Sequence, residues 1–318
     1  MSDVTAFGAT WRRVSIVTRR RVSPVLRRRA MFAFLCVVWG TTWLAMKVGV
    51  ATVPPGFFAG MRWGCAGVAL LAWRVSQGHR PRIPRRMIGR VVLVSVLLVS
   101  LSQVIQLYGL RHITAGLAAV ISSALTPIAL LGFSASLGQE RFTLRQGVAI
   151  ALGVVGILVL FGPKAFTGEL NLPEVLGALG VVIATLFYSF GSVLLRPMMG
   201  SMPPADLAWM TNCVGGGLLL IGSILFEPGA HAAMHFDWGM SVWLAWVYLL
   251  IPGSLLSTVI YFLLVRDWGA SRVGTYAFIS PVIAVVLGAT LFGEHVEIAD
   301  VMGMALMLVA AAIVLRQT

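Results

Sequence analysis

Two tryptophans and a lysine recur at four-residue spacing in the stretch WGTTWLAMK, which lies inside an apolar run. Side chains at positions i, i+4 and i+8 share one face of an α-helix, so Trp39, Trp43 and Lys47 are expected on the same side. Indole rings offer apolar contact and an N–H donor, and the ammonium group offers a positive charge. Such a face suits a small solute that carries an anionic group on an apolar or zwitterionic body. Snorkelling of Lys47 to lipid headgroups is the alternative interpretation.

Polar side chains form similar faces in other apolar runs. Hydrocarbon offers them no hydrogen-bond partner, so they must contact protein groups or a hydrated interior. One interpretation is a shared cavity; the alternative is that single hydroxyl and amide groups bond neighbouring helices, at about 0.6 kcal/mol each. The candidate cavity residues are Trp39, Trp43, Lys47, Arg62, Gln103, Gln106, Tyr108, Tyr188, Ser192, Asn212, Ser257 and Tyr261. The faces of Tyr188 and Tyr261 also include Thr185, Ser189, Ser254 and Thr258.

Arg62 is the charge that is hardest to place in lipid. It lies six residues into an apolar run, and a charge at that depth is costly unless it is solvated or paired. None of the eleven Asp and Glu residues lies in the middle of an apolar run. Arg62 is therefore expected to face water, carbonyl groups or an anionic ligand, and a structural role stays open beside a binding role. A surplus of buried positive charge favours a solute with a carboxylate or another anionic group.

Two prolines lie in the middle of apolar runs. Pro127 and Pro281 each remove one backbone donor, which kinks a helix and frees a carbonyl group. They are candidates for paired hinges near the centre of the membrane. Static kinks that shape the packing are the alternative.

Signatures of enzymes, metal sites and nucleic-acid binding are missing from the sequence. It contains no His-Glu-x-x-His or Gly-x-Ser-x-Gly motif, and its three cysteines lack the paired spacing of a metal site or disulfide. The net charge is +13, but the arginines cluster beside apolar runs, where positive charge fixes orientation or contacts anionic lipid. The sequence predicts a non-enzyme without cofactor or metal. Its expected partners are the lipid bilayer and a small-molecule metabolite, with no nucleic acid, and a homodimer stays open.

Membrane-spanning helices must position these side chains. Of the 318 residues, 58% are hydrophobic and 11% are charged, whereas soluble domains carry about 25% charged residues. A run of about 20 apolar residues can cross a bilayer as a helix. The sequence therefore predicts an all-α integral membrane protein with ten transmembrane helices. These are expected at residues 31–51, 56–76, 88–109, 113–137, 144–162, 173–195, 205–225, 241–264, 272–292 and 299–316.

Positive charge is distributed unevenly around these helices. All Lys and Arg residues except Lys47, Arg62, Arg111 and Lys164 fall on one side of the membrane when both chain ends share that side. In membrane proteins this side is the cytoplasmic one. The sequence predicts a multi-pass protein of the cell's inner membrane with both termini in the cytoplasm and a basic cytoplasmic segment at 1–30. A targeting signal in that segment is the alternative.

The two halves of the chain show weak internal similarity. A shift of 149 residues aligns the first and second expected helices with the sixth and seventh, and a shift of 154 aligns the fourth with the ninth. The aligned pairs include Pro55 and Pro204, Gly67 and Gly216, Lys47 and Arg196, Pro127 and Pro281, and Glu140 and Glu294. Because each half has five helices, an odd number, the second half would enter the membrane the opposite way round. We expect two inverted five-helix repeats, residues 31–162 and 173–316, around a central cavity, as in transporters that work by alternating access.

Several stretches resemble a known family. The segments FLCVVWGTTWLAMKVGV, YGLRHITAGLAAVISSALTPIALL and GASRVGTYAFISPVIAVVLGATLFGEHV are similar to the EamA family of the drug/metabolite transporter superfamily, over about residues 31–316. The resemblance implies ten helices around a central cavity and movement of small metabolites, often the export of amino acids. The chain departs from the family in the loop sequence GQE at 138–140, where the family usually places Gly directly before Glu.

Together these features predict a secondary transporter that exports small amino-acid-like or other carboxylated metabolites by alternating access. One alternative keeps transport but changes the cargo to sugar-phosphates or nucleotide conjugates, which would need more cations in the cavity. Another is a membrane sensor or assembly partner that transports nothing. The substrate's identity, the coupling ion and the direction of transport stay open.

Overall fold

A computed structural model describes residues 23–80, 82–165, 171–292 and 298–315 of the chain. Within these ranges the chain is helical and contains no β-strand, so the all-α fold class is confirmed. Most of the basic segment 1–30, Glu294 of the internal similarity and Arg316 lie outside the described residues.

The helices overlap the ten expected ranges. The longer ones are α1 (Pro24–Val50), α2 (Pro55–Ser76), α5 (Ala115–Ser136), α6 (Leu144–Ala165), α7 (Leu172–Leu195), α8 (Pro204–Phe226), α13 (Tyr276–Phe292) and α14 (Ile298–Leu315). Two further rods are continuous but composite. The first runs through η1 (Arg85–Met87), α3 (Ile88–Ser95), η2 (Val96–Leu101) and α4 (Ser102–His112), and the second through α10 (Met240–Tyr248), η4 (Leu249–Leu256) and α11 (Ser257–Trp268). Short helices η3 (Arg196–Gly200), α9 (Ala230–Ala233) and α12 (Ala270–Val273) lie in connections.

Six helical stretches within the described residues are long and apolar enough to cross a membrane. They are Pro24–Val50, Arg85–His112, Ala115–Ser136, Leu172–Gly200, Pro204–Phe226 and Met240–Trp268. Shorter apolar helices cover Leu144–Val159 and Val301–Leu315.

Local sequence signals explain where several helices begin. Proline occupies the first helical turn of α1, α2, α7 and α8, where its missing N–H would have no helical partner anyway. The Thr114 side chain accepts a hydrogen bond from the Leu117 amide at the start of α5. Asn171 and Glu174 form a reciprocal capping box at the start of α7. These caps fix the helix ends and therefore the depth of each polar face.

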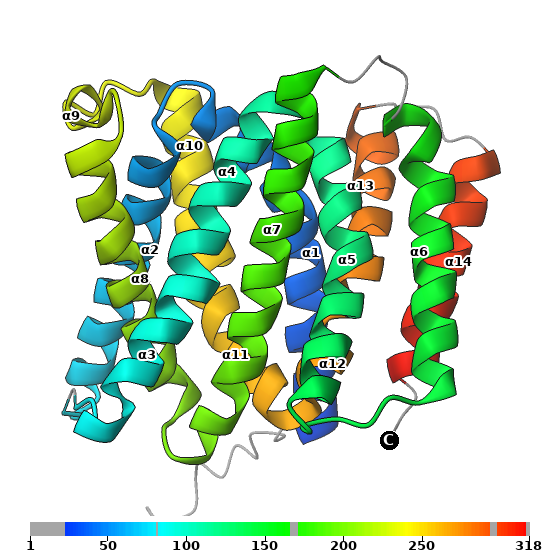
Figure 1. Cartoon of the computed structure of the whole chain (residues 1–318), viewed down its shortest axis with the longest axis horizontal. Helices are drawn as coiled ribbons and strands as arrows, with labels where there is room; N and C mark the ends of the chain where they lie inside the picture. The colour runs from blue at the N-terminus through cyan, green and yellow to red at the C-terminus, as the bar shows by residue number, and fades with distance from the viewer. Residues whose placement is uncertain (1–22, 81, 166–170, 293–297, 316–318) are drawn as a thin grey trace, which may run out of the picture.

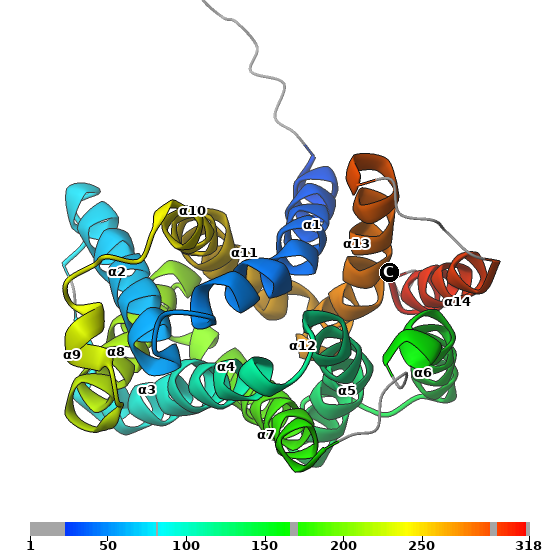
Figure 2. The same cartoon turned by 90° about the horizontal axis from the view of Figure 1, so that it is seen from above.

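Glycines allow α2 and α8 to pack backbone against backbone. A Cβ atom on Gly67 would lie 2.5 Å from the Cys213 nitrogen, and one on Gly216 would lie 2.3 Å from the Gly64 nitrogen. No larger side chain fits at either point without separating the helices. The α2–α8 pair forms the left side of the bundle in the view of Figure 1, and α6 packed against α14 forms the right side (Figure 1, Figure 2).

The packing in one half of the chain has a counterpart in the other. Helix α7 contacts α4 and α5, and α1 likewise contacts α11 and α13, while α5 and α13 also touch each other. Both composite rods contain a π-helical segment, η2 in one and η4 in the other. Proline interrupts α5 and α13 at Pro127 and Pro281. These correspondences follow the order of the internal sequence similarity.

Ion pairs join helices at the end of the bundle where α1 begins, which we call the proximal end. Arg74 of α2 makes a bidentate contact with Asp206 of α8 at 2.6 and 3.0 Å, and Arg28 of α1 pairs with Asp267 of α11 at 2.9 Å.

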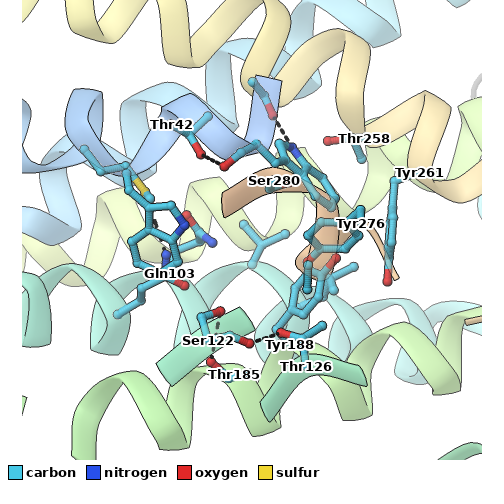
Figure 3. A pocket seen from close by; sticks show the side chains of 18 of the residues that line it. Thr42, Gln103, Ser122, Thr126, Thr185, Tyr188, Thr258, Tyr261, Tyr276 and Ser280 are labelled. Carbon is cyan, nitrogen blue, oxygen red and sulfur yellow. Dashed lines mark hydrogen bonds between the residues drawn. The ribbon is translucent and has the colours of Figure 1, made fainter. Parts of the chain in front are cut away.

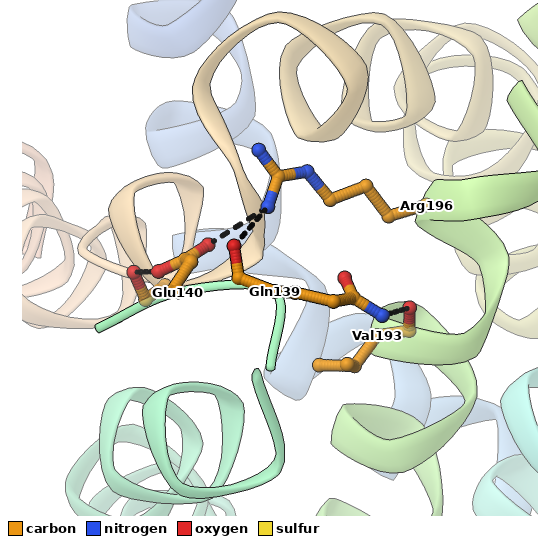
Figure 4. Close-up of polar contacts among 5 residues, drawn as sticks. Gln139, Glu140, Val193 and Arg196 are labelled. Atoms are coloured by element: carbon orange, nitrogen blue, oxygen red, sulfur yellow. Dashed lines mark hydrogen bonds and ion pairs between the residues drawn. The ribbon is translucent and has the colours of Figure 1, made fainter. Parts of the chain in front are cut away.

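A polar network also links helices at the proximal end. It consists of Gln139, Glu140, Arg196 and Ser271, and we call it the proximal network. The Glu140 carboxylate pairs with Arg196 at 3.5 Å (Figure 4). It also accepts a hydrogen bond from Ser271. Gln139 donates to the Val193 carbonyl at 2.9 Å. The GQE loop, which departs from the family pattern, therefore ties the end of α5 to α7 and α12.

Glu227 anchors the opposite, distal end. Its carboxylate accepts hydrogen bonds from the Gly56 and Phe57 amides, both at 3.1 Å, and from the Tyr108 hydroxyl at 2.6 Å. Ser223 donates to the same carboxylate at 2.5 Å. A carboxylate at a helix N-terminus is favourable because the free amides and the helix dipole both attract negative charge. Glu227 thus fastens α8 to the start of α2 and to α4.

Candidate functional site

A central cavity of about 130 Å³ lies between the helices of both halves. A water takes about 30 Å³ in the liquid, so the space holds several waters or a small solute. Eight of the expected cavity residues line it: Trp39, Trp43, Arg62, Gln103, Gln106, Tyr188, Asn212 and Tyr261. Figure 3 shows Gln103 on one side of this space and Tyr188, Tyr261 and Tyr276 on the other.

Trp39 is the centre of an aromatic wall. Its ring centroid lies 4.7 Å from that of Tyr276, 5.2 Å from that of Tyr261 and 6.4 Å from that of Tyr188. Its indole N–H donates to the Gly253 carbonyl at 3.4 Å. Gly253 belongs to the π-helical segment η4 of the second composite rod. The irregular helix therefore supplies the carbonyl that orients the first tryptophan of the WGTTW motif.

Arg62 is the charged residue in the cavity lining, and its side chain is only 3% exposed. One terminal nitrogen donates to the Gln103 side-chain oxygen at 2.5 Å, and the guanidinium lies 4.9 Å from the centre of the Trp63 ring. Its Nε atom is buried and has no hydrogen-bond partner in the described structure. No carboxylate lines the cavity among the described residues. A buried guanidinium with free donors is chemically a site for an anion.

Asn212 presents a second group without a partner. It lies on α8, is 0% exposed, and neither its amide nitrogen nor its oxygen is hydrogen-bonded within the described residues. A buried amide without partners costs about 1–3 kcal/mol. Since Asn212 lines the cavity, a solute or water is the natural partner for both atoms.

Several hydroxyl groups also line the cavity. Thr126, Thr185 and Thr258 each donate to the carbonyl four residues earlier in their own helix, at 2.6, 2.8 and 2.5 Å. Ser280 donates to the Cys36 carbonyl of α1 at 3.0 Å. Because each hydroxyl proton is committed to a carbonyl, these oxygens can act toward the cavity only as acceptors. The Tyr188 and Tyr261 hydroxyls of the aromatic wall, by contrast, have no partner within the described residues and can still donate.

The other four expected residues do not line the cavity. Lys47 donates to the Leu110 and Ile113 carbonyls at 2.6 and 2.8 Å, where a cation satisfies the free carbonyls at the end of α4. Tyr108 contacts Glu227 at the distal end. Ser192 and Ser257 donate to the carbonyls of Tyr188 and Pro252 in their own helices, at 2.8 and 2.6 Å.

The two predicted hinge prolines border the cavity through their neighbours. Thr126 and Ser280 directly precede Pro127 and Pro281, and both line it. A proline breaks the bond to the carbonyl four residues earlier. Those residues are Ser123 and Ala277, and both also line the cavity. The helix breaks therefore lie at the level of the site, and their role as hinges stays a prediction.

Sequence reasoning missed several lining residues. They are Thr42, Met46, Trp63, Leu98, Val99, Ser122, Ser123, Thr126, Gly253, Phe262, Tyr276, Ala277 and Ser280. A usable signal existed for four of them. Ser122 with Thr126, and Tyr276 with Ser280, repeat at four-residue spacing in α5 and α13, which places each pair on one helix face.

Comparisons with known proteins agree with the membrane fold. The model of the EamA-like transporter family matches residues 29–162 and again 175–316. The inner membrane transporter YedA of Escherichia coli K12, itself uncharacterized, is 30% identical over 83% of this chain and 82% of its own length. The uncharacterized transporter YvbV of Bacillus subtilis 168 is 27% identical over 92% of each chain. A solved crystal structure at 21% identity covers 90% of this chain and 96% of its own, with a TM-score of 0.73.

These matches and the apolar helices make the chain a multi-pass membrane protein. They point to a transporter rather than an enzyme, and they confirm the resemblance found in the sequence. The chain belongs to the EamA-like transporter family.

Proposed function

We propose that this protein is a secondary transporter that exports small carboxylated metabolites, amino-acid-like ones included, by alternating access. The observation that carries the proposal is Arg62, a buried guanidinium in a central cavity whose described lining holds no carboxylate. Such a group is costly in a membrane unless water or an anion reaches it. The eight lining residues that the sequence singled out are the proposed substrate contacts.

The proposed architecture is ten transmembrane helices in two inverted five-helix repeats, residues 31–162 and 173–316. Two separate family matches support this division. So do the paired π-helical segments and the paired proline breaks in corresponding helices. Two similar halves of opposite orientation can exchange conformations, which opens one central site to each side in turn.

The proximal end is the proposed cytoplasmic end. It carries Arg28 at the start of α1 and the cluster between Arg74 and Arg90, and positive charge is enriched on that side of membrane proteins. In this orientation the proximal network and the two proximal ion pairs close the cytoplasmic end. Glu227 holds α2, α4 and α8 together at the outer end. The two sets of contacts would open in alternation.

Transport assays test this function. The purified protein is reconstituted in liposomes, and the efflux of labelled carboxylated solutes is measured. In a second assay, cells that overexpress the protein are screened for extracellular metabolites and for resistance to toxic amino-acid analogues. We expect export that persists without ATP and falls at least about tenfold in Arg62→Gln, the loss that corresponds to about 1.4 kcal/mol. Arg90→Gln, a change at an exposed arginine, is the matched control. Wild-type export by a correctly inserted Arg62→Gln protein would overturn the assignment.

A further inference from the structure

We infer that the cavity selects monoanions: molecules with a single carboxylate on an aromatic or apolar body and no ammonium group. The inference rests on the proposed function, because it concerns the substrate class of the same cavity. It narrows the substrate class of that function to simple carboxylates, and it sets aside the amino-acid-like part of the class together with amines and phosphate esters.

The first step is the charge that the protein itself brings to the cavity. Arg62 is the charged residue among the described lining residues, and the other polar groups there are amides, hydroxyls and indoles. Its hydrogen bond to Gln103 is made to a neutral amide oxygen, so it leaves the positive charge uncompensated. The described lining therefore carries one net positive charge.

The second step compares the net charge after each class of ligand has bound. A monoanion brings the cavity to neutrality, whereas a zwitterion leaves it positive. A phosphate monoester dianion makes the cavity negative, and an amine adds a second positive charge. Leaving a net charge in a low-dielectric site is costly, because neither solvent nor a partner stabilises it. The monoanion is thus the class whose binding removes an existing penalty rather than keeping or adding one.

The third step is the supply of donors. The Arg62 Nε atom and the Asn212 amide nitrogen are buried and have no partner within the described residues. Gln103 engages the terminal nitrogen that shares an edge with Nε, so Nε itself is the guanidinium donor without a partner. The two oxygens of a carboxylate can each accept a bond from a separate donor, and a charged donor strengthens such a bond. The unpartnered donors on α2 and α8 are what one carboxylate would use.

The fourth step concerns the body of the ligand and the absent ammonium group. Trp39, Trp43 and Trp63 line the space next to the polar groups, and aromatic rings pack well against a planar apolar body. The threonine hydroxyls of the lining can accept a hydrogen bond, but they carry no formal charge. They can hold a phenol or indole N–H of the ligand, yet they cannot neutralise an ammonium group.

Four compounds that share a phenyl ring test this selectivity near neutral pH. They are 3-phenylpropanoate, L-phenylalanine, 2-phenylethylamine and phenyl phosphate, and they present one negative charge, a zwitterion, one positive charge and a dianion. Their binding to the purified full-length protein in nanodiscs is measured by calorimetry. We expect 3-phenylpropanoate to bind at least about tenfold more tightly than each of the others, a difference of about 1.4 kcal/mol. In Arg62→Lys the order should persist, and in Arg62→Gln it should disappear.

Each outcome decides the question. Equal or tighter binding of phenylalanine or phenyl phosphate overturns the inference, and so does failure of all four compounds to bind a correctly folded wild-type protein. The wild-type ranking is decisive even if the Arg62 variants do not fold. If the compounds bind in the expected order but none of them crosses the liposome membrane, the proposed transport function is contradicted and the selectivity stands. Transport that prefers phenylalanine would contradict the selectivity and leave the proposed transport function intact.

Discussion

Replacing Glu140 by Gln should loosen the proximal end of the bundle. Glu140 pairs with Arg196 at 3.5 Å, with side chains 15% and 30% exposed, and it also accepts a bond from Ser271. Two unit charges at that separation attract by about 5 kcal/mol at an effective dielectric constant of 20. Partial exposure and the long contact reduce this strongly, and pairs of this kind retain about 1 kcal/mol at most. We therefore expect a roughly fivefold rise in the population with an open proximal end.

Thiol labelling measures this change. Ser192 lies on α7, one helical turn beyond the lining residue Tyr188, and is 0% exposed, so a cysteine placed there, in a protein without its native cysteines, reports opening. Its reaction with a membrane-impermeant reagent added from the proximal side should be about fivefold faster with Glu140→Gln. Asp237→Asn, a change at an exposed carboxylate, is the matched control and should leave the rate unchanged. An unaltered rate in a folded Glu140→Gln protein would refute the argument that the proximal network holds this end closed.

Three further changes test the packing and the site. Gly216→Ala would bring a Cβ atom to 2.3 Å from the Gly64 nitrogen. It should lower the free energy of unfolding by about 1–3 kcal/mol, which is measured as a lower melting temperature. The control Gly217→Ala, whose Cβ atom meets nothing within 4 Å, should leave the melting temperature unchanged. Glu227→Gln should lower the melting temperature modestly, since it weakens charge-assisted bonds to the start of α2 by about 1 kcal/mol, and an unchanged value would show that the distal anchor contributes nothing. Asn212→Leu should preserve or raise stability, because no protein hydrogen bond is lost, while it reduces transport; a variant that loses stability and keeps transport would contradict the assignment.

The helices were predictable because bilayer thickness fixes their length and composition marks them. The irregular segments within these helices were only partly predictable. Pro127 and Pro281 are visible in the sequence as breaks, since proline cannot donate in a helix. The π-helical segment η2 contains no proline, and it follows from tertiary packing that local sequence does not encode.

The sequence identified the helix faces that carry polar and aromatic residues, but it did not show which of these residues meet at the cavity. Helical spacing placed Trp39 and Trp43 together, but it could not say that Lys47 on the same face would extend to the carbonyls that end α4. Which face of a helix meets the cavity depends on its rotation about its own axis, and neighbouring helices set that rotation. Ser192 and Ser257 show the consequence, because each satisfies its hydroxyl within its own helix instead.

The most direct test of the central claim is carboxylate transport by liposomes that contain wild-type, Arg62→Lys or Arg62→Gln protein, with Arg90→Gln as control. The account predicts that uptake of labelled 3-phenylpropanoate is strong in the wild type and the control, weaker in Arg62→Lys, and lost in Arg62→Gln. Equal uptake by all four folded proteins would contradict the claim that the buried guanidinium binds the transported anion.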